Sequence, residues 1–299
     1  MSSMGQQSRL IMKKTQLVKI SILLLIGVFC LSSCQKDGVF NPKKKISKIY
    51  VQEEGEDEKV LSESWTWNKD KLVRIDMDYG NSIQFEYDGK QLSKIVLDPH
   101  NYTKCIYQGN KLDKMETYST YFSSTVLVSV NTFKYSRDKI SRIIVEDYNI
   151  DINPTEVKTI NPLRFVLPQQ LSEKVMEHLQ MRKDGKKGTS TYNISLIWKG
   201  DNLEKMITYV ETEGGIMENV QTYTYDNKNS PLYGLLYPIP VSSKNNVIKE
   251  TYTPYQSDLE GAEFAYSYTY EDNYPKERKA TINTDGVPYT LIQFYEYLK

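Results

Sequence analysis

The chain has 299 residues, with 38 basic and 38 acidic side chains and a net charge of zero. Residues 1–33 contain four bases, Arg9, Lys13, Lys14 and Lys19, and no acid, so the rest of the chain has a net charge of −4. A nucleic-acid-binding surface needs a basic surplus, and this composition therefore argues against a nucleic-acid partner.

The N-terminal segment combines three features of an export signal. The bases Lys13 and Lys14 precede an apolar run from Ile20 to Leu31, which ends in Leu31-Ser32-Ser33-Cys34. The run is too short to span a bilayer core of ~30 Å, which needs about 20 residues. The segment resembles a bacterial lipoprotein signal with its lipobox. That resemblance implies cleavage before Cys34 and lipidation of its thiol and amine, so that several acyl chains anchor the protein stably in a membrane.

The residues after Cys34 bear on location and domain boundaries. Gln35 stands where an aspartate would favour inner-membrane retention, so the outer membrane is expected, with its periplasmic face and the cell surface both left open. The predicted division is a signal peptide over 1–33, an anchor linker over 34–40 and a single β-repeat domain over 41–299. If Met12 is the true start, residues 1–11 are not translated.

A four-residue pattern of apolar, any, basic and apolar residues recurs along the chain. Most copies follow a turn rich in aspartate, asparagine and glycine, such as Tyr87-Asp88-Gly89-Lys90, and such turns between strand-forming residues predict β-hairpins. The copies begin at Ile46, Leu72, Leu92, Leu112, Ile140 and Leu203.

The strands upstream of the turns alternate apolar and polar residues. Ile83, Phe85 and Tyr87 alternate with polar neighbours, and a later run from Phe264 to Tyr270 does the same. These patterns predict an all-β, antiparallel meander that forms a large curved sheet or partial barrel. The three-residue separation of Leu72 from Ile75 does not fit a flat strand, so either a bulge intervenes or both faces are partly covered.

The hairpin pattern is interrupted between Asn153 and Gly188. Leu171, Val175 and Leu179 recur at helical spacing and predict one short helix over 169–180. A loop or turn is expected over 183–188, and a proline-containing loop over 230–246.

The tyrosine-aspartate-glycine turns and leucine-x-basic-isoleucine strands resemble the YD hairpins of Rhs-type proteins. More closely, the whole chain after the signal resembles a family of gut-bacterial lipoproteins of unknown function described as having a porin-like fold. Its matching segments include Tyr225–Tyr233 and Tyr268–Pro275. The resemblance implies a porin-like fold and carries no catalytic or binding residues to this chain.

The chain offers little recognisable catalytic or metal-binding chemistry. His100 and His178 lie far apart, and no Cys-x-x-Cys or glycine-rich phosphate loop is present, so we expect neither a cofactor nor a metal site. The acidic run Glu53–Glu58 lacks the alternating spacing of a calcium loop and is better explained as a solvated hairpin tip. Cys105 lies in a strand-like run, where a buried small apolar residue is favoured over a reactive thiol.

The basic residue occupies the same, third position in every copy of the repeat, which suggests that these residues lie at matching positions along the sheet. We call these residues the basic series, and they form a candidate column for a polyanionic glycan: Lys48, Arg74, Lys94, Lys114, Arg142 and Lys205. The alternative is that acids on intervening strands, such as Glu86 and Glu116, pair with them. The 24 tyrosines could likewise offer flat faces to sugar rings, although a half-exposed sheet also uses tyrosine to cover its core.

Three classes of function remain. A noncatalytic accessory or binding lipoprotein of the envelope, with a glycan or an envelope protein as partner, is preferred, and no enzymatic activity is expected. A pore is the second class, but spanning strands need an uncharged lipid-facing band, whereas these hairpins carry charges every few residues. A hydrolase of glycans or peptides is the third, although no pair of carboxylates is set apart by its spacing.

Overall fold

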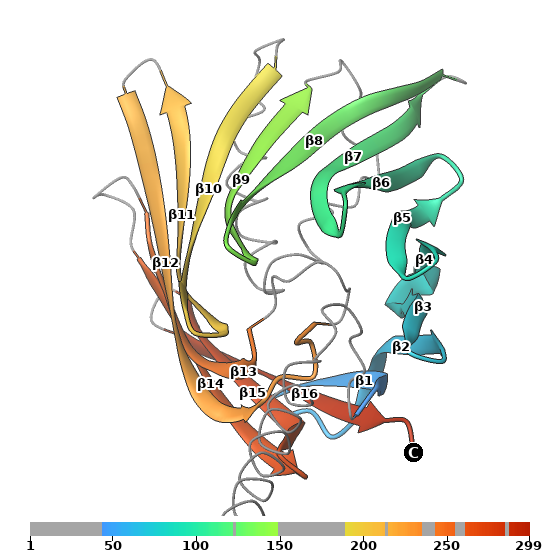
Figure 1. Cartoon of the computed structure of the whole chain (residues 1–299). Coiled ribbons are helices and arrows are strands. Elements are labelled where there is room, and N and C mark those ends of the chain that lie inside the picture. Colours follow the sequence, from blue (N-terminus) through green and yellow to red (C-terminus); the bar gives the residue numbers. More distant parts are fainter. Residues whose placement is uncertain are drawn as a thin grey trace, which may run out of the picture. The chain divides into compact units, whose positions relative to one another are not determined.

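The computed structural model describes residues 44–121, 124–148, 189–212, 215–234, 243–254, 261–284 and 287–299. These residues form a wall of antiparallel strands, shown in Figure 1. The strands are β1 (Ile46–Glu53), β2 (Val60–Asn68), β3 (Lys71–Met77), β4 (Ser82–Asp88), β5 (Gln91–Asp98), β6 (Asn101–Gln108), β7 (Lys111–Tyr121), β8 (Ser124–Ser136), β9 (Lys139–Tyr148), β10 (Thr189–Lys199), β11 (Asn202–Thr212), β12 (Gly215–Asn229), β13 (Asn245–Thr253), β14 (Ala262–Glu271), β15 (Tyr274–Thr284) and β16 (Val287–Tyr297).

Each strand pairs with its neighbours in sequence, and the sheet closes into a barrel through β1 and β16. Ile46–Glu53 pairs antiparallel with Leu291–Tyr297, and the Leu298 amide donates to the Lys45 carbonyl at 2.8 Å. The all-β antiparallel prediction is confirmed, and the large curved sheet or partial barrel that the sequence predicts is a closed barrel in the structure. Closure satisfies the backbone groups that two free edges would leave without partners.

The described residues contain only one short helical element, a 3-10 turn at Asp78–Gly80. The helix predicted over 169–180 and the loop over 183–188 lie outside the part of the chain that the structure describes. Of the loop over 230–246, Ser230–Gly234 and Ser243–Asn246 are described. The predicted hairpin turns are present, with glycines at left-handed φ angles of 56° at Gly89, 62° at Gly109 and 60° at Gly200.

β-Bulges explain the three-residue spacing of the repeat. Thr66 pairs with Arg74 and Trp67 with Leu72, so Val73 has no partner and Leu72 and Ile75 point to the same face. The same irregularity occurs in each odd-numbered strand of the barrel. The unpaired residues are Ser47, Val73, Ser93, Asp113, Ser141, Glu204, Ile248 and Lys276.

The bulges also reveal two repeat copies that the sequence pattern missed. They begin at Val247 and Pro275, in β13 and β15, and give eight copies in the described barrel. Both copies have a charged residue, Glu250 or Arg278, at the fourth position, where the other six have an apolar residue.

A ring of aromatic hydrogen bonds follows the bulges around the barrel. In each repeat an aromatic side chain donates to the carbonyl of the residue that begins the preceding copy, at 2.5 to 2.9 Å. The pairs are Trp67 to Ile46, Tyr87 to Leu72, Tyr107 to Leu92, Tyr135 to Leu112, Trp198 to Ile140, Tyr225 to Leu203, Tyr268 to Val247 and Tyr297 to Pro275. The ring fixes the register of each hairpin against the one before it.

Removing one of these donors should destabilise the barrel measurably. Tyr87→Phe leaves the Leu72 carbonyl without its side-chain donor, and we expect a loss of about 1 kcal/mol in the free energy of unfolding by urea. Tyr102→Phe is the matched control, because the Tyr102 hydroxyl has no hydrogen-bond partner among the described residues. Equal stabilities of the two variants would show that the ring contributes nothing.

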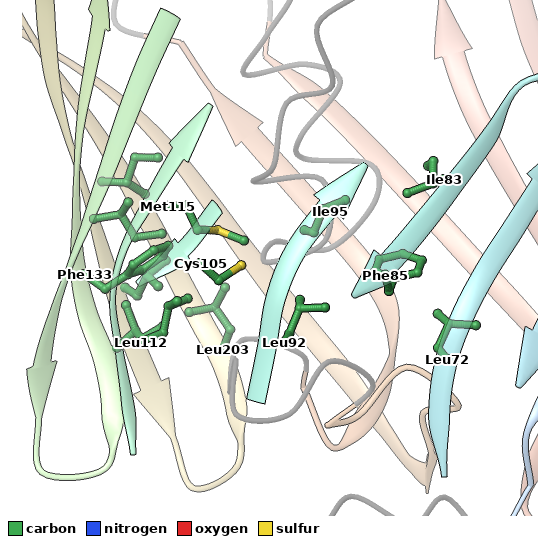
Figure 2. Packing of buried hydrophobic residues seen from close by; sticks show 14 of the residues in the cluster. Leu72, Ile83, Phe85, Leu92, Ile95, Cys105, Leu112, Met115, Phe133 and Leu203 are labelled. Atoms are coloured by element: carbon green, nitrogen blue, oxygen red, sulfur yellow. The ribbon is translucent and has the colours of Figure 1, made fainter. Parts of the chain in front are cut away.

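The two faces of the sheet differ sharply in polarity. Side chains on one face are buried and mostly apolar, and Figure 2 shows Leu92, Ile95, Met115 and Phe133 among them. On the opposite face, mid-strand positions are exposed and polar or charged, as at Gln84, Lys104, Lys134, Arg142 and Glu263. Because a closed sheet encloses only its inner face, the apolar side chains line the interior and the charged ones face outward.

Candidate functional site

The basic series lies on the outer face of the barrel. Its six residues occupy the third repeat position in β1, β3, β5, β7, β9 and β11, directly after each bulge. Because every second strand carries a member, neighbouring members are separated by two inter-strand spacings, or about 9.5 Å. The predicted common register is therefore present.

The partners of the basic series are only partly those expected. Arg74 forms an ion pair with Asp76 at 2.5 Å, and the Lys94 ammonium lies 4.2 Å from the centroid of the Tyr102 ring. Within the described ranges, Lys48, Lys114, Arg142 and Lys205 form no ion pair.

The two acids proposed as partners do not neutralise the series. Glu86 lies opposite Lys94 in the β4–β5 register but makes no ion pair with it among the described contacts. Glu116 instead accepts a hydrogen bond from the Tyr118 hydroxyl at 2.7 Å, which together with burial raises the pKa of Tyr118 to about 12. An anionic ligand for the series therefore stays a prediction.

Neutralising part of the series tests that prediction. If the series binds polyanions, wild type should be retained on heparin in a salt-sensitive way, and Arg74→Gln, Lys94→Gln and Lys114→Gln combined should abolish retention. The control replaces Lys199, Lys276 and Lys279 by Gln, which removes the same charge outside the series. If wild type is not retained, or if the control loses retention equally, the series is structural.

A tyrosine pair lies beside the series on the outer face. The Tyr102 and Tyr118 rings stack with centroids 5.2 Å apart, and the Lys104 ammonium lies 4.9 Å from the Tyr118 centroid. These contacts, together with that of Lys94, already occupy ring faces that a sugar would need. The tyrosine faces of this pair are therefore poorly placed as a glycan platform.

A second group of polar side chains lies on the interior face, where the sequence pattern indicated none. Strands β12 to β16 place tyrosines and two opposite charges beside one another. We call this group the interior polar sector: Tyr223, Glu250, Tyr266, Tyr268, Arg278 and Tyr295.

The members of the interior polar sector interact closely. The Tyr266 hydroxyl donates to Glu250 Oε2 at 3.2 Å, and the Arg278 guanidinium lies 5.3 Å from the centroid of the Tyr266 ring. Burial, and then the nearby Glu250 carboxylate, raise the pKa of Tyr223 and Tyr266. The phenols therefore stay protonated at physiological pH, so each hydroxyl keeps a proton that it can donate.

Other candidate residues give weaker signals. Cys105 is buried, as predicted, and burial raises the pKa of its thiol to about 12, so it is a poor nucleophile. His100 is exposed in the β5–β6 turn, and the acids from Glu54 to Glu58 are exposed. The described residues contain no group of three or more His, Cys, Asp or Glu side chains placed to hold a metal ion. Cys34 and His178 lie outside the described residues.

No helix among the described residues is long and apolar enough to cross a membrane.

Comparison with known proteins supports the fold. No protein-family model and no curated protein sequence matches the chain. Among solved structures, the chain is similar to a porin-like protein from Bacteroides vulgatus ATCC 8482, with a TM-score of 0.51, 10% sequence identity and coverage of 86% of this chain and 99% of that one. At this identity the likeness concerns the fold alone, and it agrees with the porin-like fold that the family resemblance implied.

Proposed function

We propose that the chain is a noncatalytic binding protein of the bacterial outer membrane. It is anchored by lipid on Cys34, and the outer face of its barrel is exposed to solvent. The observation that carries this proposal is the polarity of the wall. Apolar side chains line the interior, whereas mid-strand positions of the outer face carry exposed charges such as Lys104 and Arg142. Such an outer face favours contact with water over contact with lipid.

A pore is the second candidate, and the likeness to a porin-like protein favours it. A barrel that spans a membrane carries an outward apolar band, and each Lys or Arg at mid-membrane costs about 2–4 kcal/mol. Several bases lie mid-strand on the outer face here, including Lys104, Lys134 and Arg142. The total cost of burying them in lipid makes the water-facing barrel the better proposal.

A hydrolase has less support. The interior carboxylates Glu63 and Glu250 are held by neighbouring side chains, since Glu63 accepts from Trp65 Nε1 at 2.7 Å and Glu250 accepts from Tyr266. Both contacts fit structural or ligand-binding roles as well as catalysis. We therefore propose binding and not turnover.

The proposal is tested by removing the lipid acceptor. Cys34→Ser should yield a protein that leaves the membrane and stays monodisperse without detergent. A protein that remains embedded in the membrane, or that requires detergent to stay in solution, would favour the pore.

A further inference from the structure

The interior polar sector replaces apolar residues at two positions of an otherwise regular core. The fourth repeat position holds Ile49, Ile75, Ile95, Met115, Ile143 and Met206 in six copies, and all six are buried, with at most 6% of their surface exposed. In the last two copies the same position holds Glu250, which is 1% exposed, and Arg278. The fourth repeat position is therefore apolar and buried in six of the eight described copies and charged in the last two.

The residues opposite these positions change in the same way. Trp65, Phe85, Cys105, Phe133 and Leu196 pair across the strands with the fourth-position residues of five copies. Tyr223 takes this place opposite Glu250, and Tyr268 opposite Arg278. Glu250, Arg278 and the tyrosines opposite them therefore lie within β12–β16, whose strands are side by side in the orange and red part of the wall in Figure 1.

Burying such groups is costly unless something offsets the cost. Charged and hydrogen-bonding groups lose their hydration inside a core, and replacing them by apolar residues of similar size is often neutral or stabilising. Since six copies of the repeat fold with apolar residues, the architecture itself does not require Glu250 and Arg278. Their presence points to a role other than holding the wall together.

Neighbouring atoms of the same interior face lack partners. Gln221 is 1% exposed and Tyr223 is 5% exposed, yet Gln221 Oε1 and the Tyr223 hydroxyl make no hydrogen bond among the described residues. Gln221 pairs with Met206 on β11 and with Tyr252 on β13. It therefore lies on the inner face, two residues before Tyr223 in β12. Buried polar atoms normally have a partner, and these two are free to form a hydrogen bond with an incoming ligand.

The chemistry of the group narrows the class of ligand. A carboxylate and a glutamine oxygen accept hydrogen bonds, a guanidinium and tyrosine hydroxyls donate them, and the tyrosine rings offer apolar surface. An anionic ligand would be repelled by the Glu250 carboxylate. It would also be repelled by Glu63, which lies near enough to Tyr295 to add to the effect of burial in raising the pKa of that tyrosine. A neutral molecule with several hydroxyl groups satisfies donors and acceptors alike without adding charge.

We propose that Gln221, Tyr223, Glu250, Tyr266 and Arg278 form a binding site on the interior face of the barrel for a neutral saccharide. The inference rests on the proposed binding function and names its ligand class. Hydroxyl groups of the sugar donate to Gln221 Oε1 and Glu250 and accept from Arg278, and the tyrosine rings contact its C–H faces.

The decisive variant restores the repeat pattern in the full-length protein. Glu250→Ile combined with Arg278→Ile removes both charges together, so that neither is left without its opposite. If the charges serve a ligand, the urea midpoint of this variant should equal or exceed that of wild type. A clearly lower midpoint would show that the sector holds the barrel together, and would overturn the proposal.

Ligand binding supplies the second arm of the test. Fluorescently labelled wild type is applied to an array of neutral glycans, and affinity for the retained glycans is measured by titration. The double variant should bind at least about tenfold more weakly, as expected when hydrogen bonds to charged groups are lost. Ile75→Val with Ile95→Val, which changes the same repeat position elsewhere, should bind like wild type.

The outcomes separate this inference from the proposed function. Absence of wild-type binding to every neutral glycan overturns the saccharide site but leaves a water-facing, lipid-anchored barrel intact. Equal binding by wild type and the double variant also overturns the site. Insertion of the barrel into the membrane would instead overturn the proposed function and is measured independently of glycan binding.

Discussion

Cys34→Ser is expected to move the protein from the membrane fraction to the soluble fraction. The thiol of Cys34 is the lipid acceptor that the signal motif predicts, and several acyl chains together hold a protein on a membrane where one alone does so only reversibly. Labelled palmitate should enter wild type and not the variant, and globomycin should block maturation of wild type. Membrane fractions washed with urea give the direct readout.

The opposite outcome has a clear meaning. If the Cys34→Ser protein stays in urea-washed membranes, the barrel itself holds the protein there and the lipid anchor is dispensable. Cys105→Ser is the matched control, because it removes the buried cysteine of β6 and should leave both palmitate incorporation and fractionation unchanged.

Ile143→Asp and Arg142→Asp should differ greatly in their effect on stability. Ile143 is fully buried on the inner face of β9, and Asp there loses apolar contacts and buries a carboxylate, which lowers the free energy of unfolding by about 3–5 kcal/mol. Arg142 is exposed on the outer face opposite Lys134, where Asp meets a base and changes stability by less than about 0.5 kcal/mol.

Urea titration followed by circular dichroism measures both changes. The two substitutions lie next to each other on one strand and introduce the same residue. Their difference in stability therefore shows which face of the barrel excludes water. Tolerance of Ile143→Asp would indicate a water-filled interior of the kind a channel has, and would contradict the apolar core.

Local features of the fold were predictable from the sequence. Turns such as Asp88-Gly89-Lys90 have residues that accept left-handed backbone angles, and alternation from Ile83 to Tyr87 indicates one buried face. Burial of Cys105 followed from its position in a strand. These inferences succeed because they depend on neighbours within a few residues.

Closure and the bulges depend on partners far away in the chain. The pairing of Ile46–Glu53 with Leu291–Tyr297 joins the two ends of the domain, and no local pattern specifies it. The sequence left a bulge and two covered faces as alternatives for the repeat, and only the cross-strand register at Val73 and its equivalents selects the bulge.

The interior polar sector was not predictable from the repeat pattern, because its two copies depart from that pattern. They have Glu250 or Arg278 in place of the apolar fourth residue, and the last copy has the acidic Glu277 in place of the basic third residue. The signal that could have revealed it is the position of the tyrosine-rich strand from Phe264 to Tyr270, which lies between the two irregular copies.

We propose that the outer face of the barrel contacts water in the membrane-anchored protein. Single cysteines at exposed outer positions of three strands, Lys134→Cys, Thr224→Cys and Ala265→Cys, test it in open membrane fragments. Native Cys105 gives little background, because burial raises the pKa of its thiol to about 12. We expect complete reaction of all three positions with a membrane-impermeant maleimide and no quenching of an attached fluorophore by doxyl lipids. Protection from the maleimide together with quenching by the lipids would place the wall in the bilayer and contradict a water-facing barrel.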